Sequence, residues 1–171
     1  MSKSLMSFYG QPDLVDPFNL TIEHLQPETI AHSLAQKNRY TGHALFPYSV
    51  AQHTCLLIKA VPPHLKRTAL IHDFPEFVIN DMCYPLKKNM PEYLALESVI
   101  EKQVFDLLDE PLEKMEELKP YDRRICRDEM PVLFPHFQPE WLELEPLGVE
   151  ITEWHWLTAK FTLMAYMGKY L

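Results

Sequence analysis

Residues 68–77 read TALIHDFPEF, a stretch in which the apolar run of Ala69, Leu70 and Ile71 ends abruptly in His72 and Asp73. Burying a lone carboxylate costs several kcal/mol unless a partner or a bound cation compensates for the lost hydration. The proline at position 75 disfavours the α conformation of the residue before it, so we expect the helix to kink or end there. The stretch therefore predicts either a helix end that reaches solvent or an inward-facing His-Asp pair that binds a cation.

Outward from this stretch, the chain has the composition and periodicity of a helical globular protein. Of its 171 residues 47% are hydrophobic, and 15 prolines stand against 4 glycines. Apolar residues recur every three or four positions in several windows, whereas the alternation typical of strands is weak. We expect one all-α domain over residues 1–171, because no repeat, low-complexity tract or domain boundary interrupts the pattern. The expected helices cover residues 27–37, 49–60, 63–73, 75–81, 91–109, 112–118, 120–133 and 150–169.

Charge and cysteine content limit the classes of partner. The 24 acidic residues and 16 Lys and Arg residues give a net charge of -8, which opposes binding to a nucleic-acid polymer. Three cysteines without CxxC spacing indicate a reducing compartment rather than a disulfide framework. No apolar run is long enough to span a bilayer, and the first residues, MSKSLMSFYGQPDL, lack the pattern of a secretory signal. We expect a cytoplasmic protein without a membrane anchor that binds small molecules.

Titratable residues occupy core-facing positions in three of the predicted helices. In each case the neighbours three or four positions away are mostly apolar, which places the titratable side chain on the buried face. A single such histidine is more often a hydrogen-bonded core residue, and a single aspartate more often a helix cap. The three stripes are Val50, His53, Leu57 and Val61; Leu65, Ala69, His72 and Glu76; and Leu118, Asp122, Ile125 and Val132 or Leu133.

Taken together, His53, His72, Asp73 and Asp122 favour a metal site. Two histidines and two aspartates turned inward would form an unstable charge cluster without a partner, but they are a good ligand set for a divalent transition metal. A closed structural site would show closely spaced cysteines, so we expect an open, catalytic site. We expect zinc, cobalt, manganese or iron in this site, and magnesium only together with substrate phosphates.

The segments that carry these residues resemble the HD-domain metal-dependent phosphohydrolases. His53 in YSVAQH, His72 and Asp73 in ALIHDFPE, and Asp122 in KPYDRR match the H…HD…D signature of that family. The resemblance extends over about residues 30–130 and is closest to the small single-domain branch, which includes bacterial 5'-deoxynucleotidases and phage-type triphosphohydrolases that act on dATP. It implies an all-helical HD domain with the metal held between helices, often in dimers or hexamers.

The resemblance also assigns roles to an acidic pair and to two cations. Glu76 and Asp81 match the carboxylates around the nucleophilic water, where one can accept a proton and the other can donate one to the leaving oxygen. Arg39 and Lys87 match the phosphate-facing cations of the branch. Without the resemblance, Glu76 reads as a solvent-facing helix residue and Asp81 as a turn residue.

The segment from Arg39 to Tyr48 lacks helical periodicity and is expected to form a structured loop. Tyr40 stands where family members often carry tryptophan, which implies a surface on which a base stacks. His43 could reach a phosphate or sugar oxygen, although a loop histidine without function is nearly as common. Residues 135–148, rich in proline and glutamate, read as a solvated connector.

These observations lead to a functional expectation with two alternatives. We expect a phosphohydrolase of small deoxynucleotides, and first a triphosphohydrolase that converts a dNTP such as dATP to deoxynucleoside and triphosphate. A 5'-deoxynucleotidase acting on dNMPs could use the same site. A non-catalytic nucleotide-binding or structural helical module would not need to keep the acidic pair. An apolar stripe at positions 154, 157, 161, 164 and 168 indicates a core face or the interface of a homo-oligomer.

Overall fold

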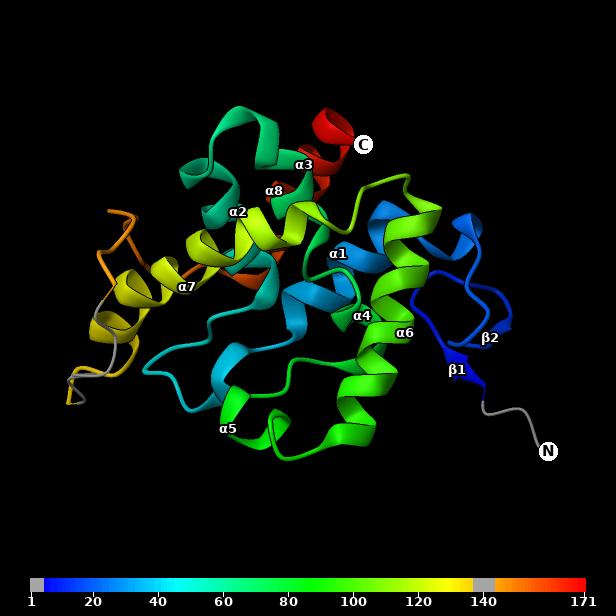
Figure 1. The fold of residues 1–171 in the computed structure, drawn as a ribbon, viewed down its shortest axis with the longest axis horizontal. Coiled ribbons are helices and arrows are strands. Elements are labelled where there is room, and N and C mark those ends of the chain that lie inside the picture. The colour runs from blue at the N-terminus through cyan, green and yellow to red at the C-terminus, as the bar shows by residue number, and fades with distance from the viewer. Residues whose placement is uncertain (1–4, 137–143) are drawn as a thin grey trace.

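The computed structural model describes residues 5–136 and 144–171 and is mostly helical (Figure 1). A short antiparallel hairpin, in which Met6 faces Val15, precedes the helices. The elements are β1 (Met6–Ser7), β2 (Leu14–Val15), α1 (Pro27–Gln36), α2 (Val50–Ala60), α3 (Lys66–Ile71), α4 (Glu76–Ile79), α5 (Tyr84–Lys87), α6 (Pro91–Leu107), α7 (Lys114–Leu133) and α8 (Trp156–Tyr170), with 3-10 turns η1 (Ile22–His24), η2 (Arg39–Gly42) and η3 (Pro63–Leu65).

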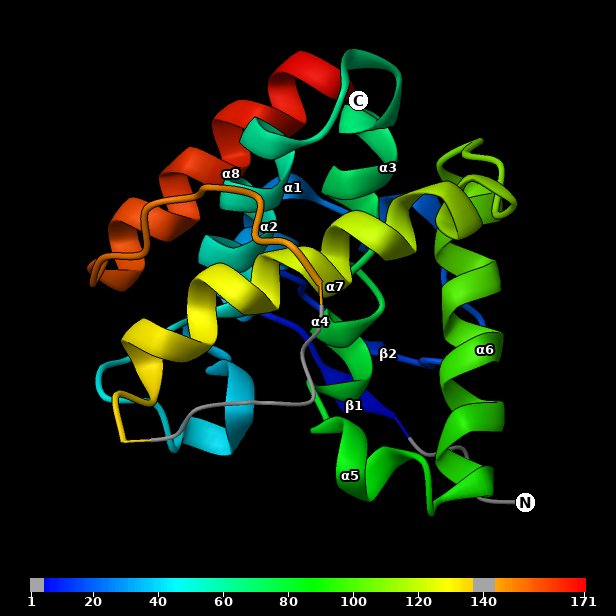
Figure 2. The ribbon, with the colours of Figure 1, turned by 60° about the vertical axis from the view of Figure 1, so that its left-hand side comes forward.

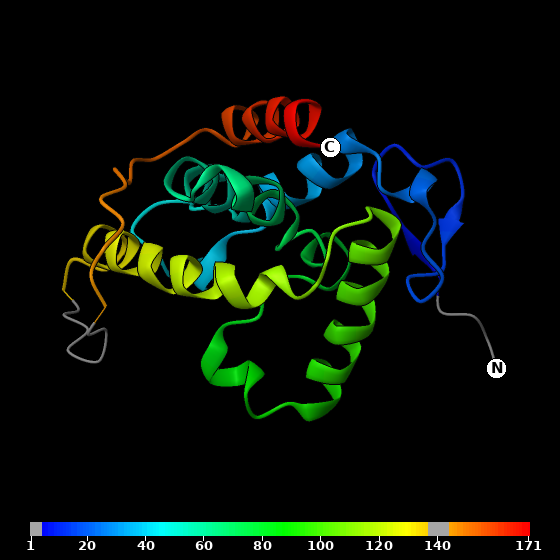
Figure 3. The ribbon, with the colours of Figure 1, turned by 45° about the horizontal axis from the view of Figure 1, so that its top comes forward.

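Helix α2 lies at the centre of the fold. It packs against α1, α3, α7 and α8, and Figure 3 shows it between α8 above and α7 below. Every residue of α2 from Val50 to Ile58 is buried, because the helix has neighbours on all sides. A polar side chain on this helix must therefore find its partner inside the protein. None of the described helices is both long and apolar enough to cross a membrane.

Helix α7 corrects the expectation of two helices separated at Pro120. The helix runs without interruption from Lys114 to Leu133 and contains Pro120 and Pro131. An interior proline removes one backbone hydrogen bond and costs about 3 kcal/mol. Leu118, Ile125 and Leu133 bury one continuous apolar face of α7 against the core, and this burial offsets the lost hydrogen bond.

Helix α8 begins at Trp156, six residues later than expected, and buries a different face from the predicted one. Its buried side carries Ala159, Leu163 and Met167, which pack toward α1 and α2. Leu157 and Phe161, both in the predicted stripe, are 38% and 59% exposed. The core interpretation is therefore wrong for Leu157 and Phe161, whereas Trp154 and Met164 of the same stripe are partly buried and pack against the core. The oligomer interpretation of the exposed face stays a prediction.

Helices α5 and α6 form an arm beside the core. The buried residues of α6 lie in its second half and are Ile100, Val104 and Phe105. The first half of α6 and α5 project away from the body of the fold, below α7 in Figure 3. Neither α5 nor the β1–β2 hairpin was expected from the periodicity, because both are too short to show one. Of the expected connector 135–148, residues 137–143 lie outside the described residues.

Candidate metal centre

Three segments bring the four predicted ligands together. Helix α2 supplies His53, the turn after α3 supplies His72 and Asp73, and α7, which crosses in front of α2 in Figure 2, supplies Asp122. His53 Nε2 lies 3.1 Å from Asp122 Oδ1 and 3.8 Å from Asp73 Oδ2. His72 Nε2 lies 3.1 Å from Asp73 Oδ2 and 3.9 Å from Asp122 Oδ1. Ligand atoms of His53, His72 and Asp122 all lie within 4.8 Å of one another.

Hydrogen bonds to the far side of each imidazole fix which nitrogen faces the cluster. His72 Nδ1 lies 2.8 Å from the Ala69 carbonyl oxygen, which can only accept, so Nδ1 carries the proton. His53 Nδ1 lies 2.6 Å from Glu129 Oε1, a carboxylate oxygen that likewise accepts. His72 Nε2 then presents a lone pair toward Asp73 Oδ2, whereas His53 Nε2, when protonated, donates to Asp122 Oδ1 at 3.1 Å. Lone pairs facing carboxylates repel unless a proton or a cation lies between them.

The geometry and the donor types fit a transition-metal ion. His72 Nε2 and Asp73 Oδ2 are buried and have no hydrogen-bond partner among the described residues. An ion bound at about 2.0–2.2 Å holds neighbouring ligand atoms roughly 3–4 Å apart, and the four separations above fall in that range. Imidazole nitrogens mixed with carboxylate oxygens suit zinc, cobalt, manganese or iron. His53, His72 and Asp122 could therefore hold one such ion, and Asp73 Oδ2 lies within 3.8 Å of both imidazole Nε2 atoms.

Glu129 belongs to this site and was missed in the sequence. Its side chain is fully buried on α7, seven residues after Asp122. Its Oε1 accepts hydrogen bonds from His53 Nδ1 and, at 2.9 Å, from the Tyr48 hydroxyl, and its Oε2 accepts one from the Tyr40 hydroxyl. A signal was present, because Glu129 falls in the same apolar stripe of α7 that singled out Asp122.

The electrostatics of the cluster favour ionised carboxylates around a charged His53. Burial and Arg39 both oppose a charged imidazole, but Glu129 and Asp122 outweigh them and raise the pKa of His53 to about 10. Burial would raise the pKa of Asp122, yet the hydrogen bond and the charge of His53 hold it well below its usual range. A divalent cation in place of the proton on His53 Nε2 would supply two positive charges where the proton supplies one.

The predicted acidic pair has the opposite electrostatics. Glu76, the first residue of α4, has a raised pKa because it is buried and because Asp73 and Asp81 lie nearby. Its Oε2 is buried without a hydrogen-bond partner in the described part of the chain. Burial and Asp73 also raise the pKa of Asp81, while Arg39 opposes the rise. Carboxyls with raised and with lowered pKa values thus lie close together, an arrangement that also occurs in acid-base sites.

The predicted substrate-binding loop is only partly directed at the cluster. Arg39 Nη1 lies 3.7 Å from Asp73 Oδ2, so this guanidinium borders the candidate metal ligands. Tyr40 uses its hydroxyl on Glu129 and places its ring edge-on to Phe134, with centroids 5.3 Å apart. Stacking of a base on Tyr40 stays a prediction. His43 is exposed at the end of η2, and across residues 5–136 and 144–171 its side chain makes no hydrogen bond or ion pair with the cluster.

Lys87 lies at the end of α5 and has a partner of its own. Its Nζ lies 2.5 Å from Glu97 Oε1 on α6. It is nevertheless close enough to Asp81 to oppose the rise in that carboxyl's pKa. The arm formed by α5 and α6 therefore places Lys87 at the edge of the site with its charge neutralised by Glu97.

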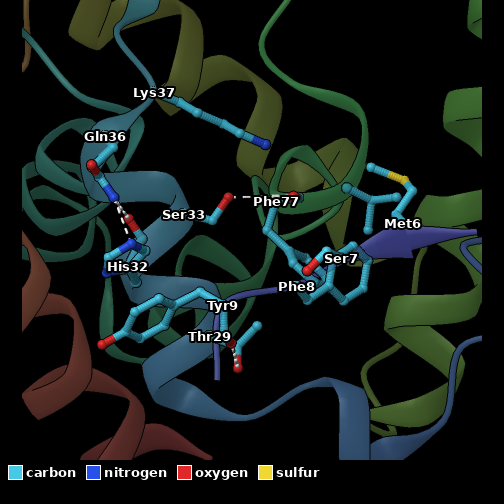
Figure 4. A pocket seen from close by; sticks show the side chains of 11 residues that line it. Met6, Ser7, Phe8, Tyr9, Thr29, His32, Ser33, Gln36, Lys37 and Phe77 are labelled. Atoms are coloured by element: carbon cyan, nitrogen blue, oxygen red, sulfur yellow. Dashed lines mark hydrogen bonds between the residues drawn. The ribbon is translucent and has the colours of Figure 1, made fainter. Parts of the chain in front are cut away.

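A separate pocket is lined in part by Phe77 and Val78, the two residues after Glu76. Its volume is about 380 Å³, and its lining includes Tyr9, His32 and Lys37 (Figure 4). Lys37 donates to the backbone carbonyl of Glu76, and burial lowers the pKa of Lys37 to about 8 against the influence of Glu76. None of the ten predicted site residues, all of which the structure describes, lines this pocket. The pocket is thus connected to the site through Lys37 and contains none of the candidate ligands.

Comparison with known proteins gives two partial similarities and no named activity. No protein-family model matches the chain. The chain is 40% identical over 72 residues to "Uncharacterized protein YfdR" of Escherichia coli, which covers 42% of this chain and 40% of that protein. It is 37% identical over 84 residues to "Uncharacterized protein RCAP_rcc00048" of Rhodobacter capsulatus, covering 44% and 41% respectively. The aligned part of the chain thus spans about two fifths of the length of each curated relative it matches.

Proposed function

We propose that the chain is an HD-domain metal-dependent phosphohydrolase that acts on small deoxynucleotides in the cytoplasm. One observation carries the proposal: two imidazole Nε2 atoms meet two carboxylates at 3.1–3.9 Å. Both Nδ1 atoms already donate elsewhere, to Ala69 and Glu129. In a fold that binds no cation, such a cluster would not stabilise the protein. Apolar residues of similar volume at these positions would give at least the same free energy of unfolding.

The chain's own residues would divide the reaction between them. A divalent ion held by His53, His72, Asp73 and Asp122 would supply Lewis acidity toward a phosphate oxygen and toward water. Glu76 would hold the attacking water through its free Oε2 and accept a proton as the water oxygen bonds to phosphorus. Asp81 would donate a proton to the sugar oxygen as the bond between that oxygen and phosphorus breaks.

Arg39 supports phosphate binding in this scheme. Its Nε is buried and has no hydrogen-bond partner within the described ranges, although Glu129 Oε2 lies 3.9 Å away. A guanidinium with a free donor beside a metal site suits a phosphate oxygen. Its side chain is 14% exposed, so a phosphate bound there would be held away from bulk water.

Two substrate classes follow from the same site. We propose a triphosphohydrolase acting on dNTPs, with dATP as the first substrate, releasing deoxynucleoside and triphosphate. One observation favours a 5'-deoxynucleotidase instead, because the ion pair of Lys87 with Glu97 removes a free cation that the outer phosphates of a triphosphate would need. Both reactions cleave the bond between the α-phosphorus and the sugar oxygen.

Product analysis tests the proposal. The protein is incubated with a panel of dNMPs and dNTPs and, in turn, with zinc, cobalt, manganese, iron(II) or magnesium. Phosphorus NMR then distinguishes orthophosphate from triphosphate. Release of triphosphate from dATP supports the first class, and release of orthophosphate from dAMP with dATP intact supports the second. If no deoxynucleotide is hydrolysed with any of these ions, the enzyme proposal is wrong. The chain is then a non-catalytic module, whether or not it binds deoxynucleotides.

We also propose that the chain forms a homo-oligomer, a dimer or a hexamer. Leu157 and Phe161 expose apolar surface on the outer side of α8, next to Trp156 at 37% exposure. Light scattering of the purified protein gives its mass in solution. A Phe161→Glu variant of unchanged mass would show that this face is not the interface.

A further inference from the structure

Glu129 joins two parts of the site that have separate tasks. One of its oxygens accepts from the imidazole of His53, on α2, at 2.6 Å. The other oxygen accepts from the hydroxyl of Tyr40, in the η2 loop that also carries Arg39. The side chain of Glu129 is fully buried, so no water competes for these bonds. The same carboxylate therefore holds a candidate metal ligand and the candidate phosphate loop.

The η2 loop has a backbone conformation that needs external support. Tyr40, Thr41 and Gly42 have φ values of 58°, 55° and 74°, three consecutive residues in the left-handed region. Tyrosine and threonine disfavour this region, and such residues persist where the surrounding structure holds them. The support comes from Tyr40, through its hydroxyl on Glu129 and its ring against Phe134.

We propose that Glu129 is a positioning residue that couples metal binding to phosphate binding. The proposal rests on the proposed function. Through His53 it keeps the lone pair of Nε2 directed at the ion. Through Tyr40 it keeps η2 in the conformation that directs Arg39 toward Asp73 and the bound phosphate. An ion that orders His53 and Glu129 thus also orders the phosphate loop, and binding linkage requires the reverse effect to be equal.

Tyr40→Phe and Tyr48→Phe form a matched pair for the test. Each variant removes one hydroxyl from the same carboxylate and leaves the ring in place. Tyr40 lies within η2, whereas Tyr48 lies after η2 and before α2. The backbone carbonyl of Tyr48 accepts from the backbone N–H of Arg39 at 2.9 Å, and Tyr48→Phe leaves that bond in place. The coupling hypothesis predicts a different outcome for the two variants, whereas a purely structural role of the Glu129 hydrogen bonds predicts the same outcome.

Calorimetry measures the coupling directly. Manganese is titrated into metal-free protein with and without inorganic phosphate, and phosphate is titrated with and without manganese. Direct contact between ion and phosphate gives every variant some coupling. The expected result is a coupling factor lowered roughly fivefold or more in Tyr40→Phe, with manganese affinity in the absence of phosphate nearly unchanged, and wild-type coupling in Tyr48→Phe. Equal coupling factors in the wild type and both variants would overturn the inference.

Glu129→Gln adds a second measurement. The amide can still accept from one partner but no longer offers two anionic oxygens, so manganese affinity should fall by about 10- to 100-fold. Circular dichroism checks that Glu129→Gln folds. If it does not fold, the inference is tested by the Tyr40→Phe variant alone. A wild-type protein that binds no transition metal overturns the proposed function and the inference with it. A wild-type protein that binds both probes, with coupling unaffected in Tyr40→Phe, overturns the inference alone.

Discussion

Two buried glutamates, Glu110 and Glu129, meet their surroundings in different ways. The Glu110 side chain is 1% exposed and accepts from Thr68 Oγ1 at 2.5 Å, from Arg67 Nη1 at 2.5 Å and from Lys114 Nζ at 3.3 Å. These donors outweigh the cost of burial and lower the pKa of Glu110. The negative charge of Glu110 is thus neutralised by two cations of the chain, Arg67 and Lys114.

The cluster around Glu129 is open, in the sense that some of its buried polar atoms have no hydrogen-bond partner among the described residues. Arg39 lies 3.7 Å from Asp73 and 3.9 Å from Glu129, and Asp122 has His53 as its neighbour at 3.1 Å. Asp73 Oδ2 keeps no hydrogen-bond partner in the described residues, although it is buried. Since the same fold neutralises Glu110 completely, an open acidic cluster is not a general property of this core. Within the chain, the second cluster draws its positive charge from His53 and Arg39, and the proposed metal ion would add to it.

Removal of His72 should have the largest effect on this contrast. His72→Ala takes one nitrogen from the candidate ligand set, so metal content should fall from one ion per chain to near zero and hydrolysis should be abolished. Elemental analysis measures the content. In the wild type, excess metal at about 100 times its dissociation constant should add about 2.7 kcal/mol to the free energy of unfolding, and this gain should vanish in the variant.

A matched control exists in His64→Ala. His64 is an exposed histidine paired with Glu117 at 2.6 Å, remote from the cluster in its contacts. This variant should keep both metal and activity. If the two histidine variants retained metal equally, the open cluster would not be a metal site, and the contrast with Glu110 would need another explanation.

Replacement of Glu76 should separate binding from chemistry within the open cluster. Glu76 is not among the candidate ligands, so Glu76→Ala should keep its metal while turnover falls roughly a hundredfold or more. Steady-state kinetics and elemental analysis on the same sample check both expectations. Near-normal turnover would transfer the role to Asp81 or to solvent, and Asp81→Asn would then decide between these two.

Replacement of Glu110 should affect stability and leave the metal site unchanged. Glu110→Gln removes the charge that Arg67 and Lys114 neutralise, which should cost roughly 1–3 kcal/mol of unfolding free energy at neutral pH. The folded pKa of Glu110 lies below its ordinary value of 4.5, so its contribution is present above that pH and is lost as the pH falls through the lowered pKa. Urea unfolding between neutral and acidic pH measures this dependence.

In the variant, that acid-dependent part of the stability should disappear while metal content stays at the wild-type level. An equal loss of metal would show that the two clusters are not independent. The wild-type and Gln variants should converge in stability at low pH, because protonated glutamate and glutamine then carry the same charge.

The sequence predicted which residues meet in the cluster better than it predicted their surroundings. His53, His72 and Asp122 were recognisable because each interrupts an apolar stripe of helical period, and Glu129 carries the same signal. The sequence could not show that α7 continues through Pro120, because burial of its apolar face outweighs the local preference of proline.

Two other features depend wholly on tertiary contacts. The left-handed backbone of Tyr40 and Thr41 contradicts the preferences of both residues and is held by contacts from α7 and beyond, which no local pattern shows. The pairing of Lys87 with Glu97 joins two helices across a turn, and neither residue alone indicates it. The sequence could therefore single out Lys87 as a candidate cation near the site, but it could not show that Glu97 neutralises its charge.

The ion pair of Lys87 with Glu97 combines features of both clusters and should give the smallest effect. Glu97, like Glu110, is neutralised by a cation of the chain. That cation, Lys87, also interacts with Asp81 beside the candidate metal ligands. Lys87→Ala should raise the KM for a triphosphate more than that for a monophosphate, since only the longer chain needs the extra charge.

Glu97→Gln sharpens this prediction because it frees Lys87 without adding a cation. We expect the KM for dATP to fall by roughly two- to fivefold and that for dAMP to change little, since a partly exposed charge pair contributes about 1 kcal/mol or less. Lys88→Ala is the control, because Lys88 is exposed over the Tyr84 ring and should leave both KM values unchanged. Equal changes for both substrates in Lys87→Ala and Glu97→Gln would place Lys87 at the α-phosphate. The outer phosphates would then have no dedicated cation on this arm, and the monophosphate would be the better candidate substrate.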